Sequence, residues 1–474
     1  MRRWGLTSWR LLLLPALAVG LLLPQQAAGG TRPDEKVDAV VEALAAEAPS
    51  AATKLHVIVL GKDLDAAQTD SEADVRHRLR TIHGEAMTVR AGKLKRLVDH
   101  DGVLRVLPDL PVQPDTIGVP LAFPSLTTLY PKIIGMPSAW NGGYSGAGVG
   151  IAVLDSGVQP IADFGTRLVQ AQLPGQTSTG DSYGHGTFVA AIAAGSNAGG
   201  SYVGVAPGAT VYAVRAAGAD GSVYSSDVIS GLDWVLANHV QYNIRVVNLS
   251  LSESATSSYL SSPLDTAVER VWRDGVVVVT SAGNRGSGAI SYAPANDPFA
   301  ITVGATDPNN TLSTSDDTVA TFSSGGTTQD GYAKPDLLAP GRQISSALPA
   351  GTTLALQAPL GNLLVGGYAT MSGTSFAAPQ VAGAAALLFE AHPNWTPDQV
   401  KAALVQSGQS MSGGSGRILS VSAATTLSGP PNPANQGLTQ SSYGLDTSST
   451  GTTNTASWNT ASWNTAAWNY SSWD

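Results

Sequence analysis

Gly373-Thr374-Ser375-Phe376-Ala377-Ala378-Pro379 places one hydroxyl, that of Ser375, between small residues at the start of a predicted helix. The residues that follow run as far as Leu388 without a strong helix breaker, and Pro379 is tolerated if it lies in the first turn. Ser375 would then lie at the positive end of the helix dipole, among backbone N–H groups that lack intrahelical acceptors. This setting suits a nucleophile, but an ordinary N-cap serine gives the same local pattern, so the remaining sequence has to decide.

The composition is that of a globular, loop-rich protein. The chain has 474 residues, of which 43% are hydrophobic, with 52 Gly and 28 Pro, and this length is enough for two or three domains. The formal net charge of −9 gives no reason to expect nucleic acid as a partner. Because the chain has no cysteine, disulfides and thiolate metal sites are excluded.

Residues 1–29 have the pattern of a signal peptide. Three arginines accompany the apolar run 11–23, and the small residues 27–29 follow it. The run is short for a membrane span, so a cleaved signal is favoured over an uncleaved anchor. We therefore expect a secreted, extracellular protein. Association with the cell surface is compatible with this location.

Residues 30–115 read as a separate small α+β domain. They carry nearly half of the Lys and Arg of the chain in less than a fifth of its length. The pattern predicts strands over 54–60 and 103–107, a helix over 71–86, and an apolar and basic stretch over 87–98. A linker-like, Pro-containing segment comes next, so we place a domain boundary between about 110 and 125. An autonomous binding domain is the alternative interpretation of this segment.

From Gly148 onward, short apolar runs alternate with helical segments. The sequence Thr396-Pro397-Asp398-Gln399 predicts a helix start with a capping box. The fold class over residues 116–428 is therefore α/β, with a mostly parallel central sheet flanked by helices, and catalytic residues in such folds gather at the carboxyl ends of strands. Five runs, each bounded by Gly, Asp, Asn or Ser, read as buried parallel strands: 149–154, 211–214, 244–249, 276–280 and 301–303.

Two residues of catalytic type stand at positions that this fold favours. Asp155 closes the strand 149–154, and His185 lies between glycines directly before an apolar segment. The two other histidines after residue 115, His239 and His392, lie near predicted helix ends, where capping or solvated roles are more common. Activation of a serine needs a base of near-neutral pKa and a carboxylate that orients it, and His185 and Asp155 can supply both.

A fourth component is Ser281-Ala282-Gly283-Asn284, which follows the predicted strand 276–280. The side-chain amide of Asn284 can donate to a developing oxyanion together with the backbone N–H of Ser375. Taken alone, Gly-Asn indicates only a turn.

Together these motifs resemble those of the subtilisin-like serine proteases, whose order of Asp, His and Ser is also found here. The resemblance covers about residues 125–425 and implies Asp155, His185 and Ser375 as a catalytic triad, with Asn284 in the oxyanion hole. It also implies that residues 30–115 are a propeptide that acts as intramolecular chaperone and inhibitor. The four motifs are Val153-Leu154-Asp155-Ser156-Gly157-Val158, Gly184-His185-Gly186-Thr187-Phe188-Val189-Ala190, Ser281-Ala282-Gly283-Asn284 and Gly373-Thr374-Ser375-Phe376-Ala377-Ala378-Pro379.

The same resemblance implies where a polypeptide substrate binds. Ser250-Leu251-Ser252 resembles the strand that pairs with the extended substrate, and Ala282-Gly283 resembles the opposite wall of the pocket for the side chain before the cut. Tyr224 resembles a residue at the border of a more distant pocket. Main-chain pairing of this kind favours unfolded segments as substrates. The family usually has Gly where Ser252 stands, so the pocket is expected to be narrower or more polar.

No cofactor is required for this chemistry. Calcium is the common stabilising ion of the family, and residues 195–202 correspond to one of its loops. Ala198 stands where a ligand amide is often found, and the loop offers few side-chain oxygens. A glycine-rich turn without a metal ion is therefore the alternative interpretation of this loop.

Residues 429–474 form a low-complexity tail, and its last part has Trp at every fifth position, from Trp458 to Trp473. A period of five suits neither one face of a helix nor one face of a strand, so we expect an extended segment outside the core. Regularly spaced Trp suggests contact with a surface, and a merely flexible extension is the alternative.

The sequence thus predicts a secreted serine endopeptidase that works through an acyl-enzyme at Ser375 and is made as a self-processing zymogen. A catalytically silent scaffold that binds peptides or surfaces is the main alternative, and it is disfavoured because all four functional positions are filled. An α/β-hydrolase esterase would carry its nucleophile in Gly-x-Ser-x-Gly, ahead of Asp and His. Ser375 is not in such a motif and follows both residues.

Overall fold

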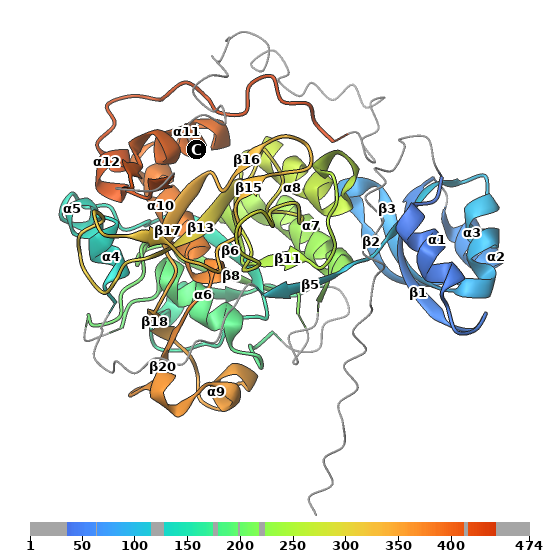
Figure 1. The fold of residues 1–474 in the computed structure, drawn as a ribbon, viewed down its shortest axis with the longest axis horizontal. Helices are drawn as coiled ribbons and strands as arrows, with labels where there is room; N and C mark the ends of the chain where they lie inside the picture. Colours follow the sequence, from blue (N-terminus) through green and yellow to red (C-terminus); the bar gives the residue numbers. More distant parts are fainter. Residues whose placement is uncertain are drawn as a thin grey trace, which may run out of the picture.

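The computed structural model describes residues 36–62, 64–114, 128–173, 179–197, 200–217, 223–411 and 416–441. A small N-terminal domain lies beside a larger α/β domain (Figure 1). The expected signal peptide and the Trp repeats lie outside the described residues. Within the described part, no helix is long and apolar enough to cross a membrane.

The larger domain is organised around a ten-stranded, mostly parallel sheet, which confirms the predicted fold class. All five predicted strands are present in it. Its main path, from one edge to the other, is β21 (Gln409–Ser410), β22 (Arg417–Ile418), β17 (Leu337–Pro340), β13 (Ile301–Asp307), β12 (Val277–Ser281), β10 (Ile244–Leu249), β6 (Gly150–Asp155), β8 (Thr210–Arg215) and β7 (Leu168–Gln170), and β14 (Thr318–Val319) pairs with β13.

The central strands are buried because helices cover both faces of this sheet. In α7 (Ser225–Tyr242), Val228, Leu232 and Val235 share one helical face and are buried. The predicted capping box is formed at Thr396. The helices are α6 (His185–Ala194) and α10 (Ala378–Ala391) on one face, α7 (Ser225–Tyr242) and α8 (Pro263–Arg273) on the other, with α11 (Pro397–Ser407) and α12 (Val421–Thr425) beside α10.

Shorter elements complete the larger domain. They are α4 (Tyr130–Ile133), α5 (Met136–Asn141), α9 (Thr353–Gln357), the hairpin of β15 (Gly326–Thr327) and β16 (Ala333–Lys334), and the sheet of β18 (Ile344–Ala347), β19 (Leu363–Leu364) and β20 (Tyr368–Met371).

The small domain has a four-stranded antiparallel sheet with the order β2-β3-β1-β4. The helix predicted over 71–86 is wrong, because these residues form β2 and the start of β3, joined by a turn in which His83 has a φ of 52°. The helix-favouring composition of this stretch is overridden by the pairing of β2 with β3. The elements are α1 (Ala39–Ala46), β1 (Lys54–Gly61), α2 (Leu64–Ser71), β2 (Asp74–Leu79), β3 (Gly84–Arg90), α3 (Leu94–Asp99) and β4 (Val103–Pro108).

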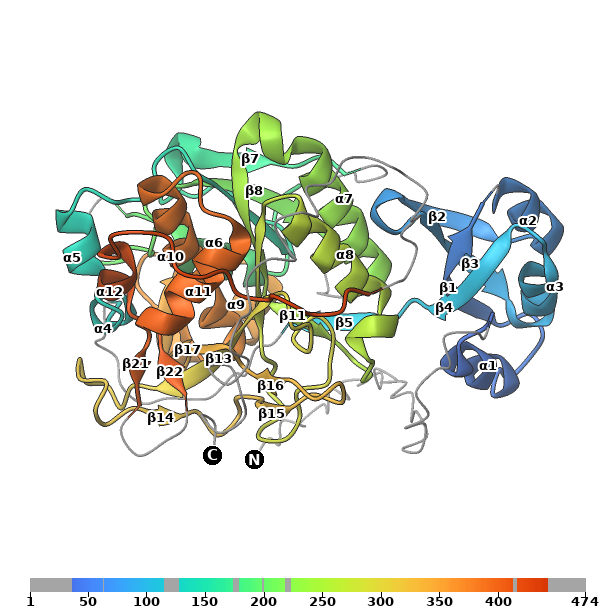
Figure 2. The ribbon, with the colours of Figure 1, turned by 90° about the horizontal axis from the view of Figure 1, so that it is seen from above.

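The two faces of this small sheet have different partners. Val57 and Val59 belong to a core that the domain forms with its own helices. Ile58, Leu79 and Ile82 lie on the other side and join the core of the larger domain. Figure 2 shows α7 and α8 between the large sheet and β2 and β3. The larger domain therefore supplies the cover for one face of the small sheet.

The chain that leaves the small domain enters the larger one as a strand. β5 (Pro111–Pro114) lies between β9 (Val223–Tyr224) and β11 (Leu251–Glu253) and is antiparallel to both. Pro114 pairs with Leu251, and Pro111 pairs with Tyr224. Residues 115–127, which follow, lie outside the described residues.

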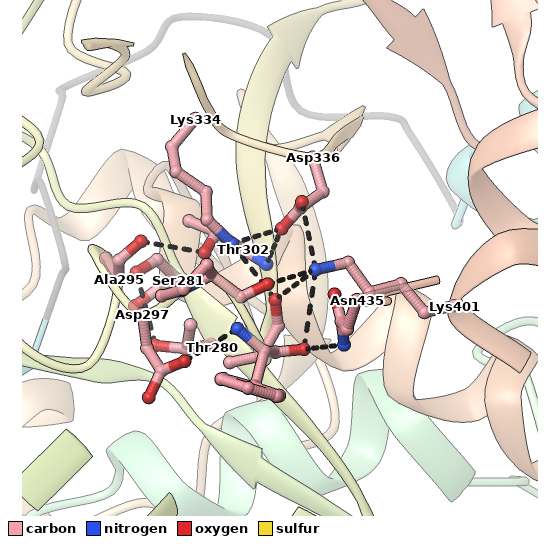
Figure 3. Close-up of polar contacts among 12 residues, drawn as sticks. Thr280, Ser281, Ala295, Asp297, Thr302, Lys334, Asp336, Lys401 and Asn435 are labelled. Atoms are coloured by element: carbon pink, nitrogen blue, oxygen red, sulfur yellow. Dashed lines mark hydrogen bonds and ion pairs between the residues drawn. The ribbon is translucent and has the colours of Figure 1, made fainter. Parts of the chain in front are cut away.

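Two buried lysines hold the segment that leads into β13. Lys401 donates to the carbonyl oxygens of Pro298 at 2.7 Å and Ala300 at 3.0 Å, and Lys334 donates to Ala300 at 3.0 Å. Both amino groups contact the Asp336 carboxylate, at 3.2 and 2.6 Å (Figure 3). Burial alone would raise the pKa of Asp336, but the two lysines hold it below its usual value. Charge and hydrogen bonds thus fix a segment without regular secondary structure.

Residues 429–441 pack on the larger domain, whereas the composition predicts a free tail from residue 429. The side-chain amide of Asn435 donates to the Phe299 carbonyl at 3.1 Å. The buried Ser441 donates its N–H to the Glu269 carboxylate at 3.1 Å. These contacts are hydrogen bonds between polar groups, and the spacing of hydrophobic residues in the sequence does not predict them. The tail therefore leaves the domain no earlier than residue 441.

We expect a variant that ends at residue 428 to melt at a lower temperature than one that ends at residue 441. The shorter variant loses several buried hydrogen bonds, each worth about 1 kcal/mol. For a domain of roughly this size, 1 kcal/mol shifts the melting temperature by about 2–4 °C, so we expect a difference of about 5–10 °C in calorimetry. The variant ending at 441 is the matched control, and equal melting temperatures would contradict a stabilising role of this segment.

Candidate active site

Asp155 and His185 are brought together by the ends of two elements. Asp155 is the last residue of β6, and His185 is the first residue of α6. The His185 Nδ1 and Asp155 Oδ1 atoms are 2.7 Å apart, and both side chains are buried. The carboxylate is placed to hold a proton on Nδ1, and this tautomer leaves Nε2 to act as the proton acceptor.

Glycines allow this close approach. A Cβ on Gly186 would overlap the carbonyl oxygen of Gly157 and lie 3.0 Å from the Cβ of Asp155. Gly157 has a φ of 102°, a conformation that side chains other than Gly rarely adopt. A larger residue at either position would displace the aspartate from the histidine.

Asp181 is a site residue that the sequence did not single out. Its fully buried carboxylate accepts hydrogen bonds from the N–H groups of Gly184 at 2.6 Å and Thr187 at 2.8 Å, at the start of α6. It also accepts from the Ser156 hydroxyl at 2.8 Å. Asp181 thus ties the loop after β6 to the helix that carries His185. An acidic residue just ahead of a predicted helix start was the available signal.

Ser375 lies in a single 3₁₀ turn, Thr374–Phe376, directly before α10, as the sequence predicts. It is buried, and its Oγ donates to the Ser250 carbonyl oxygen at 3.1 Å. The Phe376 ring lies 5.8 Å from the His185 ring, measured between centroids. The packing of α6 against α10 therefore brings the serine-bearing turn beside the histidine.

The Asn284 side chain is held with its donor free. Its Oδ1 accepts from the Thr374 N–H at 3.0 Å and from the Thr374 hydroxyl at 3.1 Å, which fixes the plane of the amide. Its Nδ2 is buried and has no hydrogen-bond acceptor among the described residues. Asn284 is thus bound to Thr374, the residue before Ser375 in the sequence. A buried donor without an acceptor at this place suits the stabilisation of negative charge on a substrate oxygen. Thr374, which orients it, was not predicted to take part.

Residues predicted to bind substrate lie in the strands on both sides of β5. Leu251 and Ser252 lie in β11, and Ser250, directly before β11, contacts Ser375. Tyr224 lies in β9 on the other side, and its ring stacks on that of His56 at 4.8 Å. Ala282 and Gly283 follow β12, and Gly283 donates its N–H to the Thr374 hydroxyl at 3.1 Å.

In the described residues of the loop related to calcium binding, the side-chain oxygen of Asn197 already has protein partners. The Asn197 Oδ1 accepts from the N–H groups of Ser201 and Tyr202, at 3.0 and 3.3 Å. The nearby Asp163 carboxylate accepts from the Tyr368 hydroxyl at 2.8 Å. Ala198 lies outside the described residues. Since these oxygens already bind protein donors, the residues do not fit a calcium ion, which needs six to eight oxygen ligands. The described part of the chain contains no group of three or more His, Asp or Glu suited to a metal.

We expect Asn284→Ala to fold normally and to lose about 10²–10³ in kcat with little change in KM, because its donor would act on the transition state rather than on the bound substrate. Steady-state kinetics on a chromogenic peptide measure both constants. Asn284→Asp is the matched control, since it keeps the acceptor for Thr374 but removes the donor, and it should lose activity equally. A loss confined to KM would refute the assignment.

Comparisons with known proteins identify the family of the chain. The model of the subtilase family matches residues 146–461. Subtilisin Savinase from Lederbergia lenta is 38% identical over 275 residues, which cover 58% of this chain and 88% of that protein. Serine protease AprX from Bacillus subtilis is 40% identical over 271 residues, 54% of this chain and 60% of that protein.

A solved structure shares the fold. Fervidolysin from Fervidobacterium pennivorans, described as a keratinolytic enzyme related to subtilisin, superimposes with a TM-score of 0.62 at 24% identity. The match covers 82% of this chain and 63% of that one. At this identity the likeness concerns the fold alone.

Proposed function

Since the chain belongs to the subtilase family of serine endopeptidases, we propose that it hydrolyses peptide bonds through an acyl-enzyme on Ser375, with Asp155 and His185 as the other members of a catalytic triad. We further propose that it is secreted and made as a zymogen whose N-terminal domain is a propeptide. Polypeptides are its substrates, and no cofactor takes part in the reaction.

Each step is assigned to a group of this chain. His185 Nε2 accepts the hydroxyl proton while Ser375 Oγ attacks the carbonyl carbon of the substrate. Asp155 stabilises the imidazolium, and Asn284 Nδ2 with the Ser375 N–H stabilises the oxyanion. His185 then donates the proton to the leaving amine. A water molecule releases the acyl group by the reverse sequence of proton transfers.

The single observation that carries the proposal is the position of β5. A segment of the chain itself lies antiparallel on β11 with Pro114 opposite Leu251, one residue from Ser250. The Ser250 carbonyl accepts from the Ser375 hydroxyl. An extended peptide in this register runs directly towards the nucleophile, as a substrate of a serine peptidase must.

Contacts outside β5 support the role of the small domain as an inhibitor. Asp109 accepts hydrogen bonds from the N–H of Ser226 at 2.9 Å and from its hydroxyl at 2.6 Å, at the start of α7. The N–H groups of Arg80 and Thr81 donate to the Asp233 carboxylate at 2.8 and 2.6 Å. The domain thus holds β5 in place through contacts at two positions along α7, and β5 excludes other peptides from the groove.

Reaction with a fluorophosphonate tests this function against the silent scaffold. We expect the processed protein to hydrolyse a denatured protein substrate and to gain one adduct, which peptide mapping places on Ser375. A protein that binds peptides but forms no adduct and cuts nothing would support the silent scaffold instead.

A further inference from the structure

Arg285 is a charged side chain beside the active site that the proposed mechanism does not use. It follows Asn284 directly in the chain. Its Nη1 donates to the Ser252 hydroxyl at 2.9 Å, and its Nη2 donates to the Glu253 carbonyl oxygen at 3.0 Å. The guanidinium lies over the Tyr292 ring, with Cζ 3.9 Å from the ring centroid. Hydrogen bonds and stacking therefore hold the cation in one position.

This position lies between the two walls assigned to the substrate side chain before the cut. Ser252 belongs to β11, and Gly283 follows β12 on the opposite side. A Cβ on Gly283 would lie only 3.1 Å from Arg285 Nη1, so the guanidinium extends from one wall to the other. We call Ser252, Gly283, Arg285 and Tyr292 the specificity subsite.

The charge of Arg285 is not balanced locally. Its partners, which are a hydroxyl, a carbonyl oxygen and an aromatic ring, are all neutral, and none of the ion pairs found in the described ranges includes it. Glu253, whose main-chain oxygen Arg285 contacts, directs its carboxyl to the Ser225 hydroxyl at 2.6 Å instead. Arg285 is also exposed. A carboxylate of a bound peptide can therefore reach an unpaired guanidinium.

The register of β5 shows which peptide residue comes nearest to the cut. Pro114 pairs with Leu251 and Gln113 with Ser252. Continued by one position, this register brings the next residue of a bound peptide opposite Ser250, whose carbonyl accepts from the Ser375 hydroxyl. In this chain the residue after Pro114 in the sequence is Asp115. In the sequence, the residue before a cut in this register is therefore acidic.

We propose that Arg285 makes this protein selective for peptide bonds that follow Asp or Glu, and that its own precursor is cut between Asp115 and Thr116. This inference rests on the proposed peptidase function. Arginine and a carboxylate form charge-assisted hydrogen bonds, often two in parallel, which are stronger than bonds between neutral groups. The aromatic ring below the guanidinium and the hydroxyl of Ser252 keep its donors oriented.

Peptides Ala-Ala-Pro-X-p-nitroanilide, with X as Asp, Glu, Phe or Lys, test the selectivity. We expect wild type to have a higher kcat/KM for Asp and Glu than for Phe and Lys. Arg285→Gln should lower the ratio of kcat/KM for Asp to that for Phe by about 10- to 100-fold, the usual effect of a hydrogen bond to a charged group. Arg285→Glu should shift the preference towards Lys. Arg417→Gln is the control, because Arg417 is an exposed guanidinium bound to the carbonyl oxygens of Gln406 and Gly408, outside the site, and should leave the ratio unchanged.

Active-site titration separates this inference from the proposed function. Each protein is titrated with the fluorophosphonate, and rates are expressed per labelled site, so that partly unfolded variants do not distort the ratios. A labelled wild type that prefers Phe, or an Arg285→Gln variant with the wild-type ratio, would overturn the role of Arg285 and leave the peptidase function standing. A wild type without labelling or turnover would overturn both. Precursor cleavage elsewhere than after Asp115 would overturn the assigned junction.

Discussion

The Ser375→Ala precursor is expected to stay in one piece, whereas the wild-type precursor cuts itself between residues 110 and 125. The reason is proximity, because β5 delivers the junction to the nucleophile at a high effective concentration. Well-oriented intramolecular reactions gain about 7–11 kcal/mol of barrier in this way. Without the hydroxyl this advantage is lost. In subtilisin, removal of the nucleophile alone lowers kcat by about 10⁶.

Intact mass of the two purified proteins measures the result. Ser372→Ala is the matched control, because Ser372 is a buried serine of the same segment whose hydroxyl only accepts from the Gln343 N–H, at 3.0 Å, and this variant should still cut itself. Cleavage of the Ser375→Ala precursor at the junction, with no other protease present, would refute Ser375 as the nucleophile.

Asp155→Asn is expected to slow self-cleavage by about 10⁴, the effect of the corresponding change in a serine protease triad. The 2.7 Å contact between Asp155 and His185 Nδ1 selects the tautomer with Nε2 unprotonated. An amide NH₂ at the same place would donate to Nδ1 and select the opposite tautomer, which cannot accept the serine proton.

The fraction of cut precursor, followed by mass over time, gives this rate. Asp163→Asn is the control, because Asp163 is a buried carboxylate that accepts from the Tyr368 hydroxyl, outside the triad, and an asparagine oxygen can do the same. A slowing of less than tenfold by Asp155→Asn would show that the carboxylate does not orient the base.

The large domain could be predicted from sequence because its strands are buried on both faces. Each therefore reads as a continuous apolar run, Asp155 follows one such run directly, and Asn284 lies three residues after the end of β12. Ser375 could be placed because the apolar, small-residue sequence after it indicates a helix with Pro379 in its first turn. In these cases local pattern and tertiary structure favour the same answer.

The remaining parts depend on contacts that a local pattern does not contain. Residues 71–86 have helix-forming composition, but β2 pairs with β3, and β3 pairs in turn with β1. Asp181 and Arg285 could not be assigned roles, because these depend on which backbone N–H groups and which hydroxyl come near them in space. The packing of residues 429–441 likewise depends on buried polar partners far away in the sequence.

One face of the small sheet is covered only by the larger domain, and this makes activation irreversible. Ile58, Leu79 and Ile82 are buried only as long as α7 and α8 lie against them. Once the cut domain dissociates, this apolar face meets water, and so small a domain has little stability to spare. We expect the released domain to unfold into an extended chain, the form that the emptied groove between β9 and β11 accepts. The former inhibitor then becomes a substrate and is destroyed, so the latent state cannot be restored and the transition is irreversible.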